Sequence, residues 1–85
     1  MNKFWLEDAW KDYLEWHDSD IRAWTRINEF IKEIERTPFK GTGRPHPLKR
    51  DRRGYWSREI TRMNRLVYRA EGNILTIAEC RGHYE

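Results

Sequence analysis

Two different apolar spacings divide this chain at a segment from Pro38 to Gly54 that is rich in glycine, proline and basic residues. Before this segment, apolar residues recur every three or four positions, which is the period of an amphipathic helix. After it, apolar residues gather in short runs separated by turn-forming residues, which is typical of antiparallel strands. The chain is therefore predicted to pack a helical half against a sheet half, in an α+β fold.

The first half is predicted to form two N-terminal helices after a short strand at residues 3–6. The apolar stripe of the first helix contains four residues at helical spacing: Trp10, Tyr13, Leu14 and His17. The stripe of the second helix contains Ile21, Trp24, Ile27 or Asn28, Ile31 and Ile34. Ser19 or Asp20 can cap the second helix, and Pro38 ends it, because the residue before a proline is disfavoured in the helical conformation. Two helices joined in this way present one apolar face that must be covered.

The second half is predicted to form a small antiparallel sheet of three strands joined by short turns. The strands are expected at residues 55–60, 64–70 and 74–80. In the middle strand, Leu66 and Tyr68 share one face, whereas Arg65, Val67 and Arg69 share the other. We expect the helices to cover the first face and to leave the second, basic face open to a ligand.

Length and composition limit the class of protein. A chain of 85 residues is expected to form a single domain, residues 1–85, and 5 Trp, 4 Tyr and 3 Phe supply large rings for a small core. Cys80, the one cysteine, cannot form an internal disulfide and is expected to pack in the core. No apolar run approaches the roughly 20 residues that span a bilayer, and acidic residues interrupt the N-terminal region where a secretion signal would be apolar. We therefore expect a cytoplasmic protein with no membrane partner.

Charge is distributed unevenly along the chain. Residues 1–35 contain 5 basic and 9 acidic side chains, a net charge of −4. Residues 36–69 contain 11 basic and 2 acidic side chains, a net charge of +9, and residues 70–85 contain 1 and 3, a net charge of −2. A basic middle segment between acidic ends indicates a polyanionic partner.

Histidine and arginine in this chain match the needs of metal-free RNA cleavage. RNA carries its own nucleophile, the 2′-hydroxyl, so cleavage needs a base, an acid and a cation beside the phosphate. His46 lies in the basic segment, Arg65 on the middle strand, and His83 with Tyr84 after the last strand. A metal site is not expected, because the histidines are far apart in sequence and no HxxxH or CxxC pair occurs. No cofactor is predicted.

Five stretches together resemble one protein family. They are "W..DAW.DYLEW", "INEFIKEIERTPFKGTGRPHPLK", "GYWSREIT", "RLVY" and "CRGHY". In this order and at this length the chain resembles a YoeB/Txe-type toxin of the RelE superfamily, the toxin half of a bacterial type II toxin–antitoxin pair. The resemblance implies a fold similar to microbial ribonucleases and cleavage of mRNA in the A site of the 30S ribosomal subunit. It also implies an acidic YefM/Axe-like antitoxin and a possible homodimer.

The resemblance assigns roles to several residues. Arg65 steadies the phosphate, His83 is the acid, Tyr84 orients or stacks the substrate, and Lys49 contacts the RNA backbone. Two further basic residues, Arg50 and Arg58, are expected to bind the RNA as well.

Two positions depart from the family pattern and leave the general base open. His46 stands between two prolines where the family typically has a glutamate base, and Glu59 stands where a basic residue is expected. We favour His46 as the base. Glu59 is the rival if the strand register places it beside Arg65, and it is excluded if Ile60 pairs with Arg65 instead. Two other functions also stay open: an RNA-binding inhibitor that blocks the ribosome without cleavage, and a nuclease that also cuts DNA.

Overall fold

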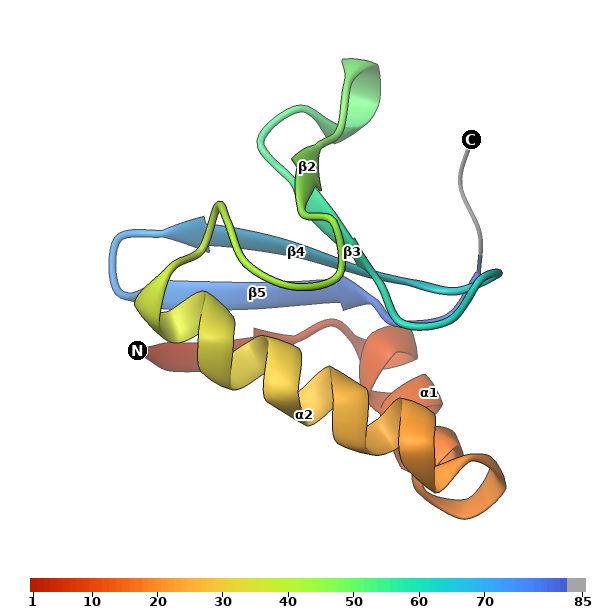
Figure 1. The fold of residues 1–85 in the computed structure, drawn as a ribbon. Coiled ribbons are helices and arrows are strands. Elements are labelled where there is room, and N and C mark those ends of the chain that lie inside the picture. The colour runs from red at the N-terminus through yellow and green to blue at the C-terminus, as the bar shows by residue number, and fades with distance from the viewer. Residues whose placement is uncertain (83–85) are drawn as a thin grey trace.

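The computed structural model describes residues 1–82, and both of its α-helices precede the strands of the second half, as the sequence predicts. In chain order they are β1 (Asn2–Trp5), α1 (Glu7–Ser19), α2 (Ile21–Arg36), β2 (His46–Pro47), the 3₁₀ helix η1 (Arg50–Arg52), β3 (Trp56–Glu59), β4 (Arg65–Glu71) and β5 (Ile74–Glu79). Figure 1 shows both α-helices together on one side of the sheet. The predicted α+β class is confirmed.

The sheet is mixed and has five strands in the order β1-β5-β4-β3-β2. The predicted antiparallel meander is confirmed, since β4 pairs with both β3 and β5 in that sense. β1 adds to the meander in parallel beside β5. β2, in the segment expected to be a loop, pairs briefly with β3. The basic segment is therefore fastened to the sheet edge instead of lying free.

Helix α2 follows the sequence prediction closely. The side chain of Asp20 caps it by accepting hydrogen bonds from the backbone N–H groups of Arg22 and Ala23, both at 3.2 Å. The helix ends at Arg36, just before Pro38. Its buried residues include three of the predicted stripe and two others: Ile27, Ile31, Ile34, Ala23 and Phe30. Ile21, predicted to be buried, is the first residue of the helix and is 54% exposed.

Helix α1 presents a different face to the core from the one predicted. Ala9 and Trp16 are buried, whereas Trp10 and Leu14 are 44% and 48% exposed. The small side chain of Ala9 lets the helix approach the end of β5 closely, and the Cys80 thiol donates to the Ala9 carbonyl at 3.3 Å. The Trp16 indole N–H donates to the Cys80 carbonyl at 2.7 Å. Close backbone approach therefore decides the orientation of α1, rather than the largest apolar side chains.

The two faces of the sheet differ as predicted. Leu66 and Tyr68 of β4 are fully buried in the core beneath the helices. Val67 points to the opposite face, which the helices leave uncovered and which we call the open face. Within residues 1–82, no helix is long and apolar enough to cross a membrane.

Candidate active site

Strand pairing gathers five side chains on the open face. The cross-strand pairs are His46 with Ser57, Ser57 with Val67, and Glu59 with Arg65. Directly paired residues project to the same face, and so do residues two apart on one strand. The open face therefore carries His46 on β2, Ser57 and Glu59 on β3, and Arg65 and Val67 on β4.

Arg65 lies at the start of β4, and the turn before it holds its guanidinium in place. Nη1 lies 3.3 Å from the carbonyl oxygens of both Thr61 and Arg62. Nη2 lies 3.4 Å from the Glu59 carboxylate. The side chain is only 15% exposed, so it is preorganised rather than mobile. A planar guanidinium held in this way is suited to bind a phosphate.

Glu59 is the direct cross-strand neighbour of Arg65. Of the two registers that the sequence allowed, the structure has the one that pairs Glu59, not Ile60, with Arg65. The backbone N–H of Glu59 donates to the Gly43 carbonyl at 2.7 Å, which ties this end of β3 to the basic segment. The carboxylate is therefore on the open face, next to the guanidinium, and the condition that would have excluded it as a base does not hold.

The chain after β5 returns to Arg65 from the other side. The Gly82 carbonyl accepts a hydrogen bond from the Arg65 backbone N–H at 3.0 Å, and the Gly82 N–H donates to Asn64 Oδ1 at 2.8 Å. Gly82 is the residue directly before His83 in the sequence. His83 and Tyr84 themselves lie outside the described residues. Arg65 thus lies between Glu59 on β3 and the backbone of Gly82.

His46 is also on the open face, but farther from Arg65. It pairs with Ser57, and its Nε2 lies 3.5 Å from Ser57 Oγ. Its Nδ1 lies 3.2 Å from the Arg44 carbonyl, so both ring nitrogens face polar partners. Two strand spacings separate β2 from β4, about 10 Å, whereas Glu59 is on the strand next to Arg65. The structure brings His46, Glu59 and Arg65 to one face but leaves His46 at its edge.

Lys49 and Arg50 are both exposed at the start of η1, just after β2. This stretch rises from the edge of the sheet beyond β2 in Figure 1. These two cations lie three and four residues after His46, both are exposed, and no described contact neutralises either of them.

Arg58 does not fit its predicted role in RNA binding. It alternates with Ser57 and Glu59 on β3, so it points to the helix side, and it is 0% exposed. Its guanidinium pairs with the Glu33 carboxylate and donates to the carbonyls of Thr37 and Lys40, both at 3.1 Å. The prediction rested on the charge of Arg58 and did not consider that successive residues of a strand point to opposite faces of the sheet. Arg58 is an internal clamp on the loop after α2.

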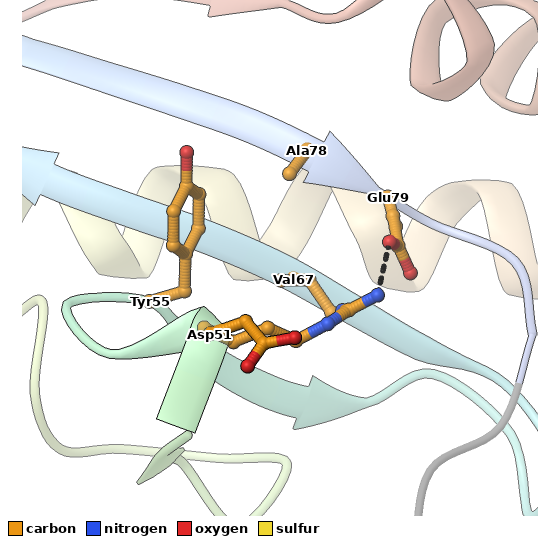
Figure 2. Close-up of a pocket in the computed structure, with 6 residues that line it drawn as sticks. Asp51, Tyr55, Val67, Ala78 and Glu79 are labelled. Atoms are coloured by element: carbon orange, nitrogen blue, oxygen red, sulfur yellow. Dashed lines mark hydrogen bonds and ion pairs between the residues drawn. The ribbon is translucent and has the colours of Figure 1, made fainter. Parts of the chain in front are cut away.

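Sequence reasoning missed a hollow of about 150 Å³ on the open face beside Val67. Its lining, drawn in Figure 2, comprises Asp51, Arg52, Tyr55, Val67, Ala78 and Glu79. We call it the Tyr55 hollow. Arg52 Nη2 donates to Glu79 Oε2 at 2.7 Å across one end. The sequence shows Tyr55 just before β3, but Arg52 of η1 and Glu79 of β5 are far apart along the chain, and only the fold brings them together.

Cys80 is buried, as predicted, and its burial raises the pKa of the thiol to about 12. The thiol is therefore neutral and unreactive near neutral pH. Within residues 1–82, no three His, Cys, Asp or Glu side chains gather closely enough to hold a metal ion.

Comparison with known protein families gives a match over most of the chain. Residues 5–84 match the model of the YoeB-like toxin of bacterial type II toxin–antitoxin systems. Toxin YoeB of Escherichia coli K12 is 50% identical over 84 residues, which is 99% of this chain and 100% of that protein.

Solved structures agree with the sequence matches. A YoeB/ParE toxin from Agrobacterium tumefaciens is 45% identical, with a TM-score of 0.95 over 99% of this chain and 100% of that one. Two structures from Staphylococcus aureus, a YoeB dimer and a YoeB–YefM complex, have TM-scores of 0.93 and 0.91 at 36% and 35% identity. Each covers 99% of this chain and 98% of the other.

Proposed function

This chain belongs to the family of YoeB-like toxins of bacterial type II toxin–antitoxin systems, and from that membership we propose that it is a metal-independent endoribonuclease. Its substrate is mRNA in the ribosomal A site, and cleavage there inhibits translation. The observation that carries the proposal is the position of Arg65, between the Glu59 carboxylate and the backbone of Gly82. An anion-binding group flanked by a base and by the residue next to an acid has the order that attack by a 2′-hydroxyl requires.

The proposed reaction uses the substrate's own nucleophile. A base takes the proton of the 2′-hydroxyl, and O2′ attacks the phosphorus. Arg65 stabilises the charge that builds on the phosphate oxygens. The bond from phosphorus to O5′ breaks as His83 donates a proton to O5′, which leaves a 2′,3′-cyclic phosphate and a 5′-hydroxyl. Tyr84 orients the substrate, and Lys49 and Arg50 hold its backbone.

We propose Glu59 as the base in preference to His46. The register supports this choice. The Glu59 carboxylate lies 3.4 Å from the guanidinium of Arg65 on the neighbouring strand, whereas His46 pairs with Ser57 from β2, which is two strands away from β4. Base and phosphate-binding group must reach the same nucleotide, so the nearer carboxylate is favoured. His46 is then a binding residue at the edge of the open face.

Two protein partners are proposed from the relatives. S. aureus YoeB forms a complex with YefM, and we propose a similar acidic antitoxin, attracted by the +9 charge of residues 36–69. S. aureus YoeB also forms a dimer, and we propose a dimer through the helices. Exposed apolar side chains on α1 and α2, at Trp10, Leu14 and Ile21, support that surface.

Toeprinting on programmed ribosomes tests the function. Wild-type protein should cut the mRNA at defined positions in the A-site codon, and His83→Ala should leave it intact. A stalled ribosome with uncut mRNA for the wild type would favour the non-cleaving inhibitor instead. Supercoiled plasmid should stay intact, since DNA lacks the 2′-hydroxyl.

Glu59→Gln and His46→Gln together identify the base. Glutamine at 59 keeps an oxygen beside the Arg65 guanidinium but cannot take a proton. Its single-turnover cleavage rate should fall by about 10²–10⁴-fold, whereas His46→Gln should lose much less. The opposite order would assign the base to His46.

A further inference from the structure

The Tyr55 hollow lies on the same face of the sheet as Arg65 but has no part in the reaction described above. We propose that it binds a nucleobase of the bound mRNA, stacked on the ring of Tyr55. This inference rests on the proposed function, because it names a subsite of the same RNA-binding face.

The lining of the hollow combines an apolar floor with an aromatic wall. Val67 of β4 and Ala78 at the end of β5 form the floor, and the Tyr55 ring stands beside them in Figure 2. Val67 is 1% exposed, so the floor is firmly packed. Single-stranded RNA is recognised largely by stacking unpaired bases on aromatic side chains, and this stacking tolerates every base.

The backbone of Tyr55 is fixed beside the hollow. Its backbone N–H donates to the Arg52 carbonyl at 3.0 Å, and its carbonyl accepts from Leu48 N–H at 2.9 Å. The Arg69 guanidinium lies 5.8 Å from the ring centroid. A tyrosine on a fixed backbone has only two side-chain torsions left to restrict, so it loses little conformational freedom when a base stacks on it.

The hollow is within reach of a nucleotide whose phosphate is bound by Arg65. Val67 is two residues after Arg65 on the same face of β4, about 6.6 Å along the strand. Val67 also pairs with Glu79 of β5, which places the polar end of the hollow on the neighbouring strand. A phosphate at Arg65 and a base in the hollow thus fit one extended strand of RNA.

The ion pair at the end of the hollow offers both kinds of hydrogen-bonding group to a base edge. Arg52 donates and Glu79 accepts, and their side chains are 41% and 34% exposed. Asp51 adds a second carboxylate to the lining. Edges of unpaired bases carry donors and acceptors together, so a paired cation and anion can meet either.

A double-mutant cycle between protein and RNA tests the proposal. Ribosomes are programmed with an mRNA that carries 2′-deoxyribose at the cleavage position, and an abasic spacer replaces each A-site nucleotide in turn. At one position the spacer should weaken wild-type binding by about 5- to 150-fold. Tyr55→Ala should weaken binding to the complete mRNA to a similar degree, and the spacer should then cause no further loss.

Three other variants complete the design. Tyr55→Phe keeps the ring and should bind as wild type, and Tyr55→Leu keeps apolar bulk without a ring and should behave as Tyr55→Ala. Phe39→Ala removes a 50% exposed ring that packs on Trp56 and should not couple to any spacer. Additive losses at every position would overturn the nucleobase site. Wild-type protein that cleaves all-ribose mRNA would still uphold the proposed function in that case, and the absence of any cleavage would refute that function instead.

Discussion

The backbone N–H of Arg65 donates a hydrogen bond to the carbonyl of Gly82, at 3.0 Å. This contact continues the pairing of β4 and β5 beyond the end of the strand. It places the backbone after β5 directly beside the residue expected to hold the scissile phosphate. Gly82 is thereby fixed next to Arg65, and the residue that directly follows Gly82 in the sequence is His83.

Asn64 is the second part of this anchor, and its removal should slow cleavage. Asn64 Oδ1 accepts from the Gly82 N–H at 2.8 Å, so Asn64→Ala frees one side of Gly82. A hydrogen bond of this kind contributes about 0.5–1.5 kcal/mol, or about 2- to 13-fold. We expect the single-turnover rate on ribosomes to fall by that factor, with ribosome binding little changed.

Asn64→Asp provides the matched control. Aspartate keeps an oxygen that accepts from Gly82, although it loses the donor that Asn64 directs to Thr61 Oγ1 at 2.9 Å. It should cleave faster than the alanine variant. Equal rates for both variants would show that the acceptor to Gly82 does not matter to cleavage.

Arg58 and Arg65 should separate stability from activity. Arg58→Met leaves the Glu33 carboxylate and several loop carbonyls without a partner in the interior, and loss of one member of a buried pair costs about 3–5 kcal/mol. Arg65→Met should destabilise the fold much less, yet it should abolish most cleavage. Urea unfolding and single-turnover cleavage measure the two effects. Similar unfolding midpoints for the two variants would contradict the assignment of Arg58 as the clamp.

These two arginines also mark the limit of prediction from sequence. Helix α2, a cap at Ser19 or Asp20 and the β3–β4–β5 meander follow from local spacing and were predicted, because each depends on neighbouring residues. Arg58 was misplaced because its partners come from a loop and a helix that are distant in sequence. Charge alone could not tell an arginine on the open face from a buried one.

Strand register and helix rotation were the other undetermined features. A shift of one residue decides whether Glu59 or Ile60 faces Arg65, and turn length alone does not fix it. The rotation of α1 depends on how closely Ala9 approaches Cys80, which is a contact across 71 residues of sequence. In both cases the deciding contact is long-range, so it becomes visible only once the chain is folded.

Stability should fall in acid partly through Glu33. Hydrogen bonds from Thr42, with the backbone N–H the largest influence, and from Arg58 lower the pKa of Glu33 below its ordinary value of 4.5. The folded state thus binds a proton less readily than the unfolded chain. This contribution to stability is complete above about pH 4.5 and is lost as the pH falls through the lower pKa of the folded state.

Thermal unfolding of Glu33→Gln across this pH range tests the assignment. The gap in unfolding free energy between wild type and Glu33→Gln should narrow as the pH falls below 4.5, since the wild type loses its charge there. Glu29→Gln, at an exposed position on the same helix, should stay within about 0.5 kcal/mol of wild type. A constant gap between wild type and Glu33→Gln would rule out Glu33 as a source of acid sensitivity.

Gly43 joins the loop after α2 to the candidate active site, so its substitution should affect both stability and cleavage. Its φ is +81°, and an added Cβ would lie 2.5 Å from Phe30 Cζ and 3.1 Å from Arg58 Cβ. Overpacking costs about 1–3 kcal/mol, and a left-handed backbone costs alanine about 1–2 kcal/mol more. Because the Gly43 carbonyl accepts from the Glu59 N–H, displacement of the loop should also move the proposed base.

Gly72→Ala isolates the backbone part of this effect. Gly72 has a φ of +60° with no atom within 4 Å of an added Cβ, so it has the backbone cost without the clash. It should lose about 1–2 kcal/mol in urea unfolding and cleave at nearly the wild-type rate, because it lies in the turn between β4 and β5. Gly43→Ala should be the less stable of the two and the slower enzyme. Equal losses in both variants would mean that the Gly43 loop can move away from Phe30 without disturbing Glu59.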